Sequence, residues 1–282
     1  MTQLTQPPQA PQPPQTPAPA ANPVSKAPVG GGLALWARAV AVIAHRDLLR
    51  QAKRPGTLIS QGVQILFFVL VYAVGFDGMI GSVDEGVPFS AYVFPGIIAI
   101  QVVSIGVASG QTYAWDREYG VLRELLVAPV PRVCLPLGKV AAGAGTVTVQ
   151  SVLMLAFAPL MGIQLTPSRF AAAAGCYALA AAVFSVIGLC LATVIQRVQT
   201  LQATVQMAMF PMLFLSGSVF SAQDAPGWLA VIMYLNPMTY AVDLARQTLL
   251  GGGGLLEWWV DLAALGGVLA AVLALLRVRS GR

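Results

Sequence analysis

Charged side chains are scarce in this sequence of 282 residues, because Asp, Glu, Lys and Arg together make up only 10% of it. Soluble domains usually carry about 25% charged residues. Hydrophobic residues reach 57% here. These proportions exclude an ordinary soluble domain and indicate a membrane protein with several spans. The length allows about six spans of about 20 residues each, which leaves little chain for a soluble catalytic domain.

Residue types that carry metal and acid–base chemistry are also nearly missing. His45 is the single histidine, which argues against zinc sites and histidine bases. The three cysteines lack metal-ligand spacing and fall in or beside apolar runs, so we interpret them as packing residues. No Gly-x-x-x-x-Gly-Lys-Ser/Thr motif occurs. We therefore expect this chain to bind no cofactor of its own.

The N-terminal region divides into two parts. Residues 1–30 are rich in proline and glutamine and have no apolar core, which predicts a disordered tail. Residues 31–56 follow a helical pattern with Arg46, Arg50 and Lys53 on one face. This pattern predicts an amphipathic helix in the cytoplasmic headgroup layer, with a soluble helix as the alternative.

Residues 57–282 contain six apolar runs, which predict an all-α integral membrane domain with six transmembrane helices. The predicted spans are 58–76, 90–113, 137–161, 170–195, 201–215 and 255–276. The region 217–250, before the last span, is broken by Pro226-Gly227 and Asn236-Pro237. Such breaks must be shielded by protein at membrane depth, so we expect short re-entrant helices there on the extracellular side.

The distribution of basic residues predicts the orientation. Of the 16 Lys and Arg residues, 14 lie before the first span, in residues 115–139, in residues 196–200 or in the C-terminal tail. The opposite side of the predicted membrane holds only Arg169 and Arg246. Because cytoplasmic loops are enriched in basic residues, we expect both termini in the cytoplasm of a multi-pass protein.

The most polar segment between two spans is 114–132. Charged residues lie between Asp116 and Glu124, whereas Leu122, Leu125 and Leu126 recur at helical spacing and can form an apolar stripe. A short amphipathic helix that ends before Pro129 is therefore expected. The spans carry almost none of the ionisable groups that ion-driven pumps place at mid-membrane. Energy for transport would then come from a separate subunit, for which this segment is the candidate docking surface; a solvated loop helix is the alternative.

Two motifs resemble those of ATP-binding-cassette type-2 (ABC-2) permeases. Asp116-Arg-Glu-Tyr-Gly-Val-Leu-Arg-Glu-Leu-Leu-Val-Ala-Pro-Val-Pro-Arg132 resembles the cytoplasmic coupling segment of that family. Their second signature is similar to Phe214-Leu-Ser-Gly-Ser-Val-Phe220, Pro226-Gly-Trp-Leu229 and Leu235-Asn-Pro-Met-Thr-Tyr-Ala-Val-Asp-Leu-Ala-Arg246. The resemblance runs from about Leu33 to the C-terminus and is greatest to permeases of the daunorubicin/doxorubicin-resistance type of drug exporter.

The resemblance implies a transporter subunit without enzymatic activity of its own. Two permease chains, as a homodimer or heterodimer, would assemble with two cytoplasmic ATPase subunits that bind ATP and Mg. The substrate would be an amphipathic drug-like or lipid-linked compound exported across a bacterial plasma membrane, and no nucleic acid is involved. A polysaccharide or glycolipid exporter is one alternative. A membrane-embedded enzyme or a non-transporting assembly subunit is the alternative from another class.

The resemblance also implies roles for particular residues. The ATPase-coupling residues would be Asp116, Arg117, Glu118, Tyr119, Gly120, Leu122, Glu124, Leu125, Leu126, Pro129 and Arg132. The extracellular gate would comprise Phe214, Ser216, Gly217, Phe220, Asn236, Pro237, Tyr240, Asp243 and Arg246.

Simpler structural interpretations exist for two pairs of these residues and for a pair of glycines in the second predicted span. Asp243 and Arg246, at i,i+3 spacing, would form a local helix pair. Asn236-Pro237 would cap and start a helix, and Gly106 and Gly110 would pack helices within the chain.

Overall fold

The computed structural model of the chain is almost entirely helical in the part that it describes. The described residues are 55–71, 82–84, 87–120, 134–218, 225–252 and 254–280, with isolated positions at 38, 41–42, 44–46, 49, 53 and 75. The predicted tail 1–30 lies outside them. Of the predicted interfacial helix 31–56, the isolated positions up to 49 are helical.

The described elements are helices and two short strands. In chain order the elements are α2 (Pro55–Leu70), β1 (Ser82–Asp84), β2 (Val87–Pro88), α4 (Phe89–Glu118), α6 (Cys134–Leu155), the 3-10 helix η2 (Ala158–Met161), α7 (Pro167–Val194), α8 (Val198–Phe214), α9 (Gly227–Leu235), α10 (Pro237–Leu250) and α11 (Trp258–Ser280). The two strands form an antiparallel hairpin in which Ser82 lies opposite Pro88. This hairpin is the one departure from the predicted all-α fold among the described residues.

Three of the described helices are long and apolar enough to cross a membrane. They are α4, α7 and the Trp258–Leu276 part of α11, and they coincide with the predicted spans 90–113, 170–195 and 255–276. Helices α2 and α8 cover two further predicted spans but have only 16 and 17 residues. The sixth, α6, has 22 residues and includes Lys139. The chain is therefore a multi-pass membrane protein, and the count of six spans remains a prediction.

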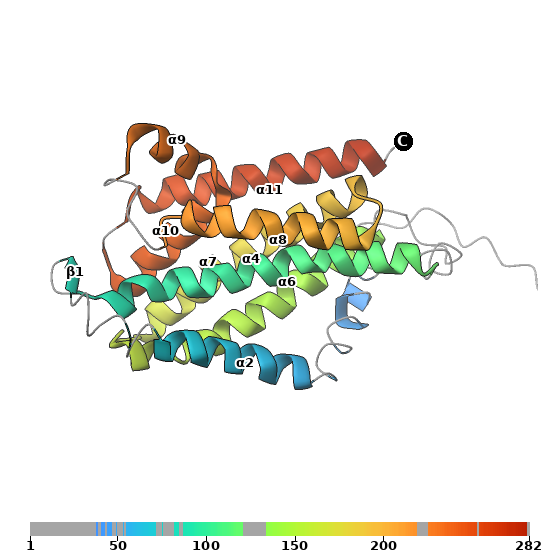
Figure 1. Cartoon of the computed structure of the whole chain (residues 1–282). Coiled ribbons are helices and arrows are strands. Elements are labelled where there is room, and N and C mark those ends of the chain that lie inside the picture. The colour runs from blue at the N-terminus through green and yellow to red at the C-terminus, as the bar shows by residue number, and fades with distance from the viewer. Residues whose placement is uncertain are drawn as a thin grey trace, which may run out of the picture.

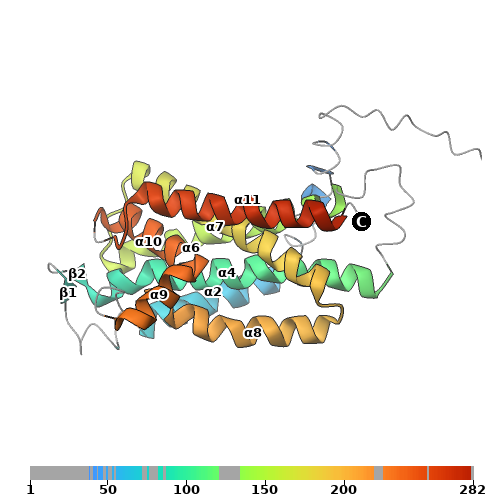
Figure 2. The same ribbon diagram turned by 90° about the horizontal axis from the view of Figure 1, so that it is seen from above.

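Helix α4 forms the centre of the bundle. Figure 1 shows α11 and α2 at opposite edges with α4, α6 and α7 between them, and Figure 2 shows α8 on the side of α4 away from α11. The main hydrophobic core includes Phe94 and Ile98 of α4, Phe184 of α7 and Leu201 of α8, all fully buried. The core therefore joins α4 to the helices on either side of it.

Small residues let α4 and α7 approach closely. A Cβ atom added to Gly110 would meet the backbone of Gly188, and one added to Gly106 would lie 2.9 Å from the Cβ of Phe184. Both glycines thus pack against α7 of the same chain, as predicted for Gly106 and Gly110. Helix α7 itself begins where Pro167 takes the first helical position and Thr166 accepts a hydrogen bond from the backbone N–H of Arg169.

The region predicted to be re-entrant contains two short helices, α9 and α10. Both lie toward the end of the bundle that carries β1, away from the C-terminal end of α11, in both views (Figures 1 and 2). The breaks predicted at Pro226-Gly227 and Asn236-Pro237 are the starts of these helices. Whether α9 and α10 enter the membrane remains a prediction.

Candidate functional site at the two ends of the bundle

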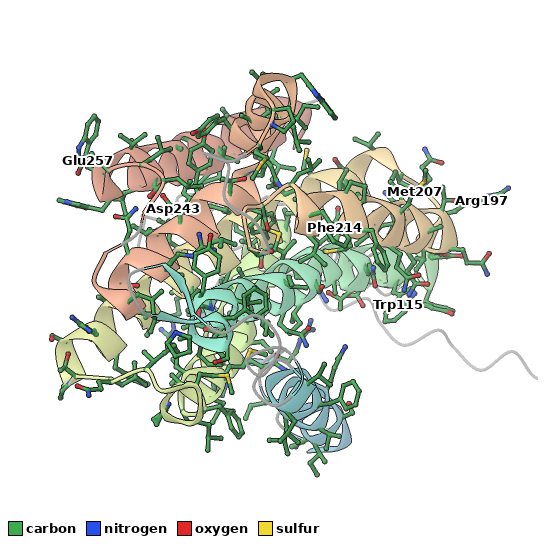
Figure 3. All side chains as sticks on the ribbon, turned by 60° about the vertical axis from the view of Figure 1, so that its left-hand side comes forward. Trp115, Arg197, Met207, Phe214, Asp243 and Glu257 are labelled. Atoms are coloured by element: carbon green, nitrogen blue, oxygen red, sulfur yellow. The ribbon has the colours of Figure 1, made fainter. Side chains whose placement is uncertain are left out.

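The residues singled out in the sequence fall at two opposite ends of the bundle. In Figure 3, Trp115 and Arg197 lie at one end, and Asp243 and Glu257 lie at the other. We call the first the Arg117 end, defined by Asp116, Arg117 and Lys139. We call the second the Arg246 end, defined by the α8–α9 connection, α10 and the start of α11.

At the Arg117 end, the predicted coupling residues begin inside α4. The sequence predicted that Asp116, Arg117 and Glu118 belong to a separate amphipathic helix, but they form the last turn of α4. Tyr119 follows as the C-cap and Gly120 has a φ of +76°, a left-handed conformation that glycine adopts without strain. The helix continues past the predicted boundary because Gly120 is the first residue that favours its termination.

Two charged side chains of this turn bind other helices. The Asp116 carboxylate forms an ion pair with the Lys139 ammonium of α6, and Lys139 is only 5% exposed. This contact ties the end of α4 to the start of α6.

Arg117 caps the end of α7. Its Nη1 atom donates to the carbonyl oxygen of Ala192 at 3.0 Å. Its Nη2 atom donates to the carbonyl oxygens of Ile195 at 3.0 Å and Gln196 at 2.8 Å. These carbonyls lie at the C-terminus of α7, where a cation is favoured by the unpaired oxygens and the helix dipole. Arg117 therefore holds α4 against α7 and the α7–α8 connection.

The neighbouring side chains point outward instead. Glu118 is exposed and Tyr119 is 79% exposed. Trp115, one turn earlier, is 42% exposed. The other predicted coupling residues lie outside the described residues: Leu122, Glu124, Leu125, Leu126, Pro129 and Arg132. The turn thus has an inward face that binds α6 and α7 and an outward face available at the surface.

At the Arg246 end, polar side chains satisfy the backbone where α8 stops. The last carbonyls of a helix have no partner within it, and water is not available at membrane depth. Ser216 and Ser218 donate to the Leu213 carbonyl at 2.6 and 3.1 Å. The Asn236 amide donates to the Met212 carbonyl at 2.9 Å.

Asn236 also starts α10. Its Oδ1 atom accepts a hydrogen bond from the N–H of Met238 at 3.0 Å, and Pro237 occupies the first helical position. The prediction that Asn236-Pro237 caps and starts a helix is confirmed. Thr239 adds a hydroxyl that lies 2.6 Å from the Met233 carbonyl and 3.1 Å from the Leu215 carbonyl. One short segment therefore closes both α8 and α9.

Arg246 is the largest fully buried side chain at this end, at 1% exposure. Its Nη2 atom donates to the Gly217 carbonyl at 2.8 Å, and its Cζ atom lies 4.0 Å from the centre of the Tyr92 ring. Gly217 follows α8 with a φ of +71°. Arg246 therefore binds the α8–α9 connection to α4 by a hydrogen bond and a cation–π contact.

Asp243, one turn before Arg246, has other partners. Its carboxylate accepts from the backbone N–H of Leu255 at 2.8 and 2.9 Å and from that of Leu256 at 3.0 Å. No direct ion pair between Asp243 and Arg246 is present in the described part of the chain, and the two side chains interact only through the attraction of their charges. Burial lowers the pKa of Arg246, and this attraction acts in the opposite direction because it favours the charged form. Helical spacing places the two residues near each other. Asp243 nevertheless accepts hydrogen bonds from Leu255 and Leu256, and Arg246 donates to Gly217.

The remaining predicted gate residues are less enclosed. Phe214 is 48% exposed, and the Tyr240 hydroxyl donates to the Tyr234 carbonyl at 2.6 Å in an exposed contact. Phe220 lies outside the described residues.

The sequence interpretation missed Tyr92, Gln247 and Asp261. Asp261 could have been noticed as a lone acid at the start of an apolar span, whereas nothing in the sequence linked Tyr92 to Arg246.

Comparison with known proteins identifies the class. The ABC-2 type transporter family matches residues 38–250. The chain therefore belongs to the ABC-2 type transporter family and is a membrane permease of the ABC transporter class. Among the described residues, no group of three or more His, Cys, Asp or Glu side chains could hold a metal ion.

Several curated permeases are similar in sequence. The putative transport permease ycf38 of Cyanophora paradoxa is 25% identical over 210 residues, which cover 73% of this chain and 72% of the relative. The probable multidrug ABC transporter permease YbhR of Escherichia coli is 26% identical over 184 residues, 64% of this chain and 49% of the relative. The daunorubicin resistance ABC transporter permease protein DrrB1 of Streptomyces coeruleorubidus is 25% identical over 250 residues, 86% of this chain and 87% of the relative.

Proposed function

We propose that this chain is the permease of an exporter whose ATP is hydrolysed by a separate subunit bound at the Arg117 end. The proposal rests on one observation: some side chains in the last turn of α4 bind neighbouring helices, and others in the same turn are exposed. Asp116 and Arg117 hold α6 and α7, while Glu118 and Tyr119 are exposed beside them. A force applied to the outward face would therefore reach three helices at once.

The proposed complex has two ATPase subunits, which bind ATP and Mg, and two permease chains. The exposed side chains of the turn and residues 121–132 together form the proposed docking surface. The Arg117 end would face the bacterial cytoplasm, because basic residues are concentrated there. The Arg246 end would then be the extracellular gate.

We propose an amphipathic drug-like or lipid-linked compound as the substrate. Met207, Phe210 and Phe214 lie on one face of α8 and are 82%, 71% and 48% exposed. Met207 and Phe214 are labelled on that helix in Figure 3. A flexible thioether and two rings can adapt to apolar ligands of different shape. The similarity to DrrB1, a daunorubicin resistance permease, supports this substrate class.

The coupling role is tested with the assembled complex. Full-length chain is co-purified with the candidate ATPase subunit, and ATPase activity is measured with and without daunorubicin as the probe. Glu118→Ala and Leu122→Ala should lose the stimulation, and Glu257→Ala, an exposed acid at the opposite end, should keep it. Unchanged stimulation in Glu118→Ala and Leu122→Ala would refute the docking surface.

The substrate class is tested separately. Inside-out vesicles that contain the complex should accumulate daunorubicin when ATP is supplied, and Phe210→Ala should slow this uptake without lowering the amount of folded protein. Transport of a polysaccharide chain in place of daunorubicin would favour the other exporter class.

A further inference from the structure

Two buried carboxyl groups meet at the Arg246 end without a cation between them. Asp243 of α10 is 1% exposed and Asp261, in the first turn of α11, is 0% exposed. Gln247, one turn after Asp243, contacts both carboxyl groups through its Nε2 atom. A single nitrogen atom therefore lies 3.2 Å from Asp243 Oδ2 and 3.0 Å from Asp261 Oδ2, which places the two carboxyl groups side by side.

The hydrogen atoms available to this cluster are too few for two carboxylates. The Asp243 carboxylate has enough hydrogen-bond donors, because the backbone N–H groups of Leu255 and Leu256 both donate to it. Gln247 Nε2 has two hydrogens but three acceptors: the Leu256 carbonyl at 2.8 Å, Asp261 Oδ2 at 3.0 Å and Asp243 Oδ2 at 3.2 Å. Asp261 Oδ1 is buried and has no donor in the described part of the chain.

The surrounding charges do not supply the missing donor. On α10, the Arg246 guanidinium is near Asp243, but its hydrogen bond goes to the Gly217 carbonyl. Tyr240 donates to the Tyr234 carbonyl, and Cys176 of α7 is a free cysteine. Arg169 of α7 is exposed near Gly251, and Glu257 is exposed and of the same sign as the pair.

We propose that Asp243 and Asp261 form a proton-binding site, in which Asp261 is held as a neutral acid and Asp243 as the anion. The proton forms the O–H bond of the Asp261 carboxyl and is donated to the Asp243 carboxylate. Its release returns it to bulk water. Two like charges in one buried site repel each other. Proton loss would therefore loosen the contact that holds α10, the loop 251–256 and α11 together. The proposal is independent of the proposed substrate and of the ATPase subunit.

Infrared spectroscopy on the purified full-length chain tests the assignment directly. The wild type should show the C=O stretching band of a buried carboxylic acid at neutral pH, and this band should disappear on titration to high pH. Asp261→Asn should lack it, and the matched control Glu257→Gln should keep it. Equal spectra of the wild type and Asp261→Asn at neutral pH would overturn the proposal.

Thermal unfolding gives a second readout. The folded protein would hold one proton more than the unfolded chain at neutral pH, so its stability should fall as pH rises. Asp261→Asn should fold and lack this slope, because an amide resembles the neutral acid. Asp243→Asn should be less stable than Asp261→Asn, because Asp243 serves the two backbone N–H groups as an anion.

Two results of the unfolding series would contradict the proton site. Failure of Asp261→Asn to fold would mean that Asp261 is needed as an anion. A rise in melting temperature on adding sodium ions, seen in the wild type and absent from Asp261→Asn, would mean that a metal cation occupies the site instead.

Discussion

The two ends of the bundle are held together in different ways. At the Arg117 end, two charged side chains of α4 reach α6 and α7 and are only partly buried. At the Arg246 end, neutral hydroxyl and amide groups satisfy the free carbonyls of α8, and the Arg246 guanidinium is fully buried. Breaking a contact costs little free energy where water can replace it, and breaking a buried contact costs more.

If the chain works as proposed, this difference would let it move at one end while the other stays closed. Partly exposed links at the Arg117 end can be remade when a partner binds. The buried links at the Arg246 end resist opening until several of them change together. Loss of the buried Arg246 should therefore lower stability more than loss of the partly exposed Arg117, and the following predictions run from the largest effect to the smallest.

Arg246→Ala should cost about 3 kcal/mol of unfolding free energy. The change removes a charged hydrogen bond to Gly217 and a cation–π contact to Tyr92, both desolvated. Denaturant unfolding of the purified chain in detergent, followed by tryptophan fluorescence, measures the loss. Arg169→Ala, which alters an exposed arginine, is the control and should change little. Equal effects of the two substitutions would contradict the buried anchor.

Arg117→Ala should cost about 1 to 2 kcal/mol, because the C-terminal carbonyls of α7 lose a cationic cap that is only partly buried. Arg197→Ala at the same end is the matched control, since that side chain is exposed. The same unfolding measurement applies. If Arg117→Ala lowered the free energy of unfolding as much as Arg246→Ala does, the proposed difference between the two ends would be wrong.

Asn236→Ala should cost about 1 kcal/mol, the usual value of a helix N-cap. Asn236→Asp keeps the oxygen that caps α10 but loses the amide that donates to Met212, so it separates the two roles. If Asn236→Asp is as stable as the wild type, the contact with the end of α8 contributes little.

Glu118→Ala should change the unfolding free energy by less than about 0.5 kcal/mol, because the side chain is exposed at the end of α4. The comparison with Arg117→Ala, its neighbour, distinguishes the two faces of the turn. A clear loss of stability in Glu118→Ala would mean that the outward face also holds the bundle together.

Local signals in the sequence predicted the parts of the structure that depend on local chemistry. Apolar runs predicted the long helices, and the Asn236-Pro237 pair predicted the start of α10. Small residues at Gly106 and Gly110 predicted a close helix contact. These features follow from residue type and spacing, which a sequence displays directly.

Partners that are distant in the sequence could not be predicted in this way. Spacing suggested that Asp243 and Arg246 pair with each other, but their partners are Leu255, Leu256, Gly217 and Tyr92. The change from apolar to charged residues near Tyr113 indicated the end of a span, yet α4 continues to Glu118. A change in polarity marks where solvent begins and says little about where hydrogen bonding along a helix stops.

Helix α4 has 30 residues, which gives a rod about 45 Å long, whereas the hydrocarbon layer is about 30 Å thick. Its first turns hold Tyr92 against Arg246, and its last turn holds Arg117 against α7. One helix thus contacts both ends of the bundle, and Pro95, near its start, interrupts its backbone hydrogen bonding close to the Arg246 end. If the chain works as proposed, a displacement of α4 at the Arg117 end would reach the residues around Arg246 through this single helix.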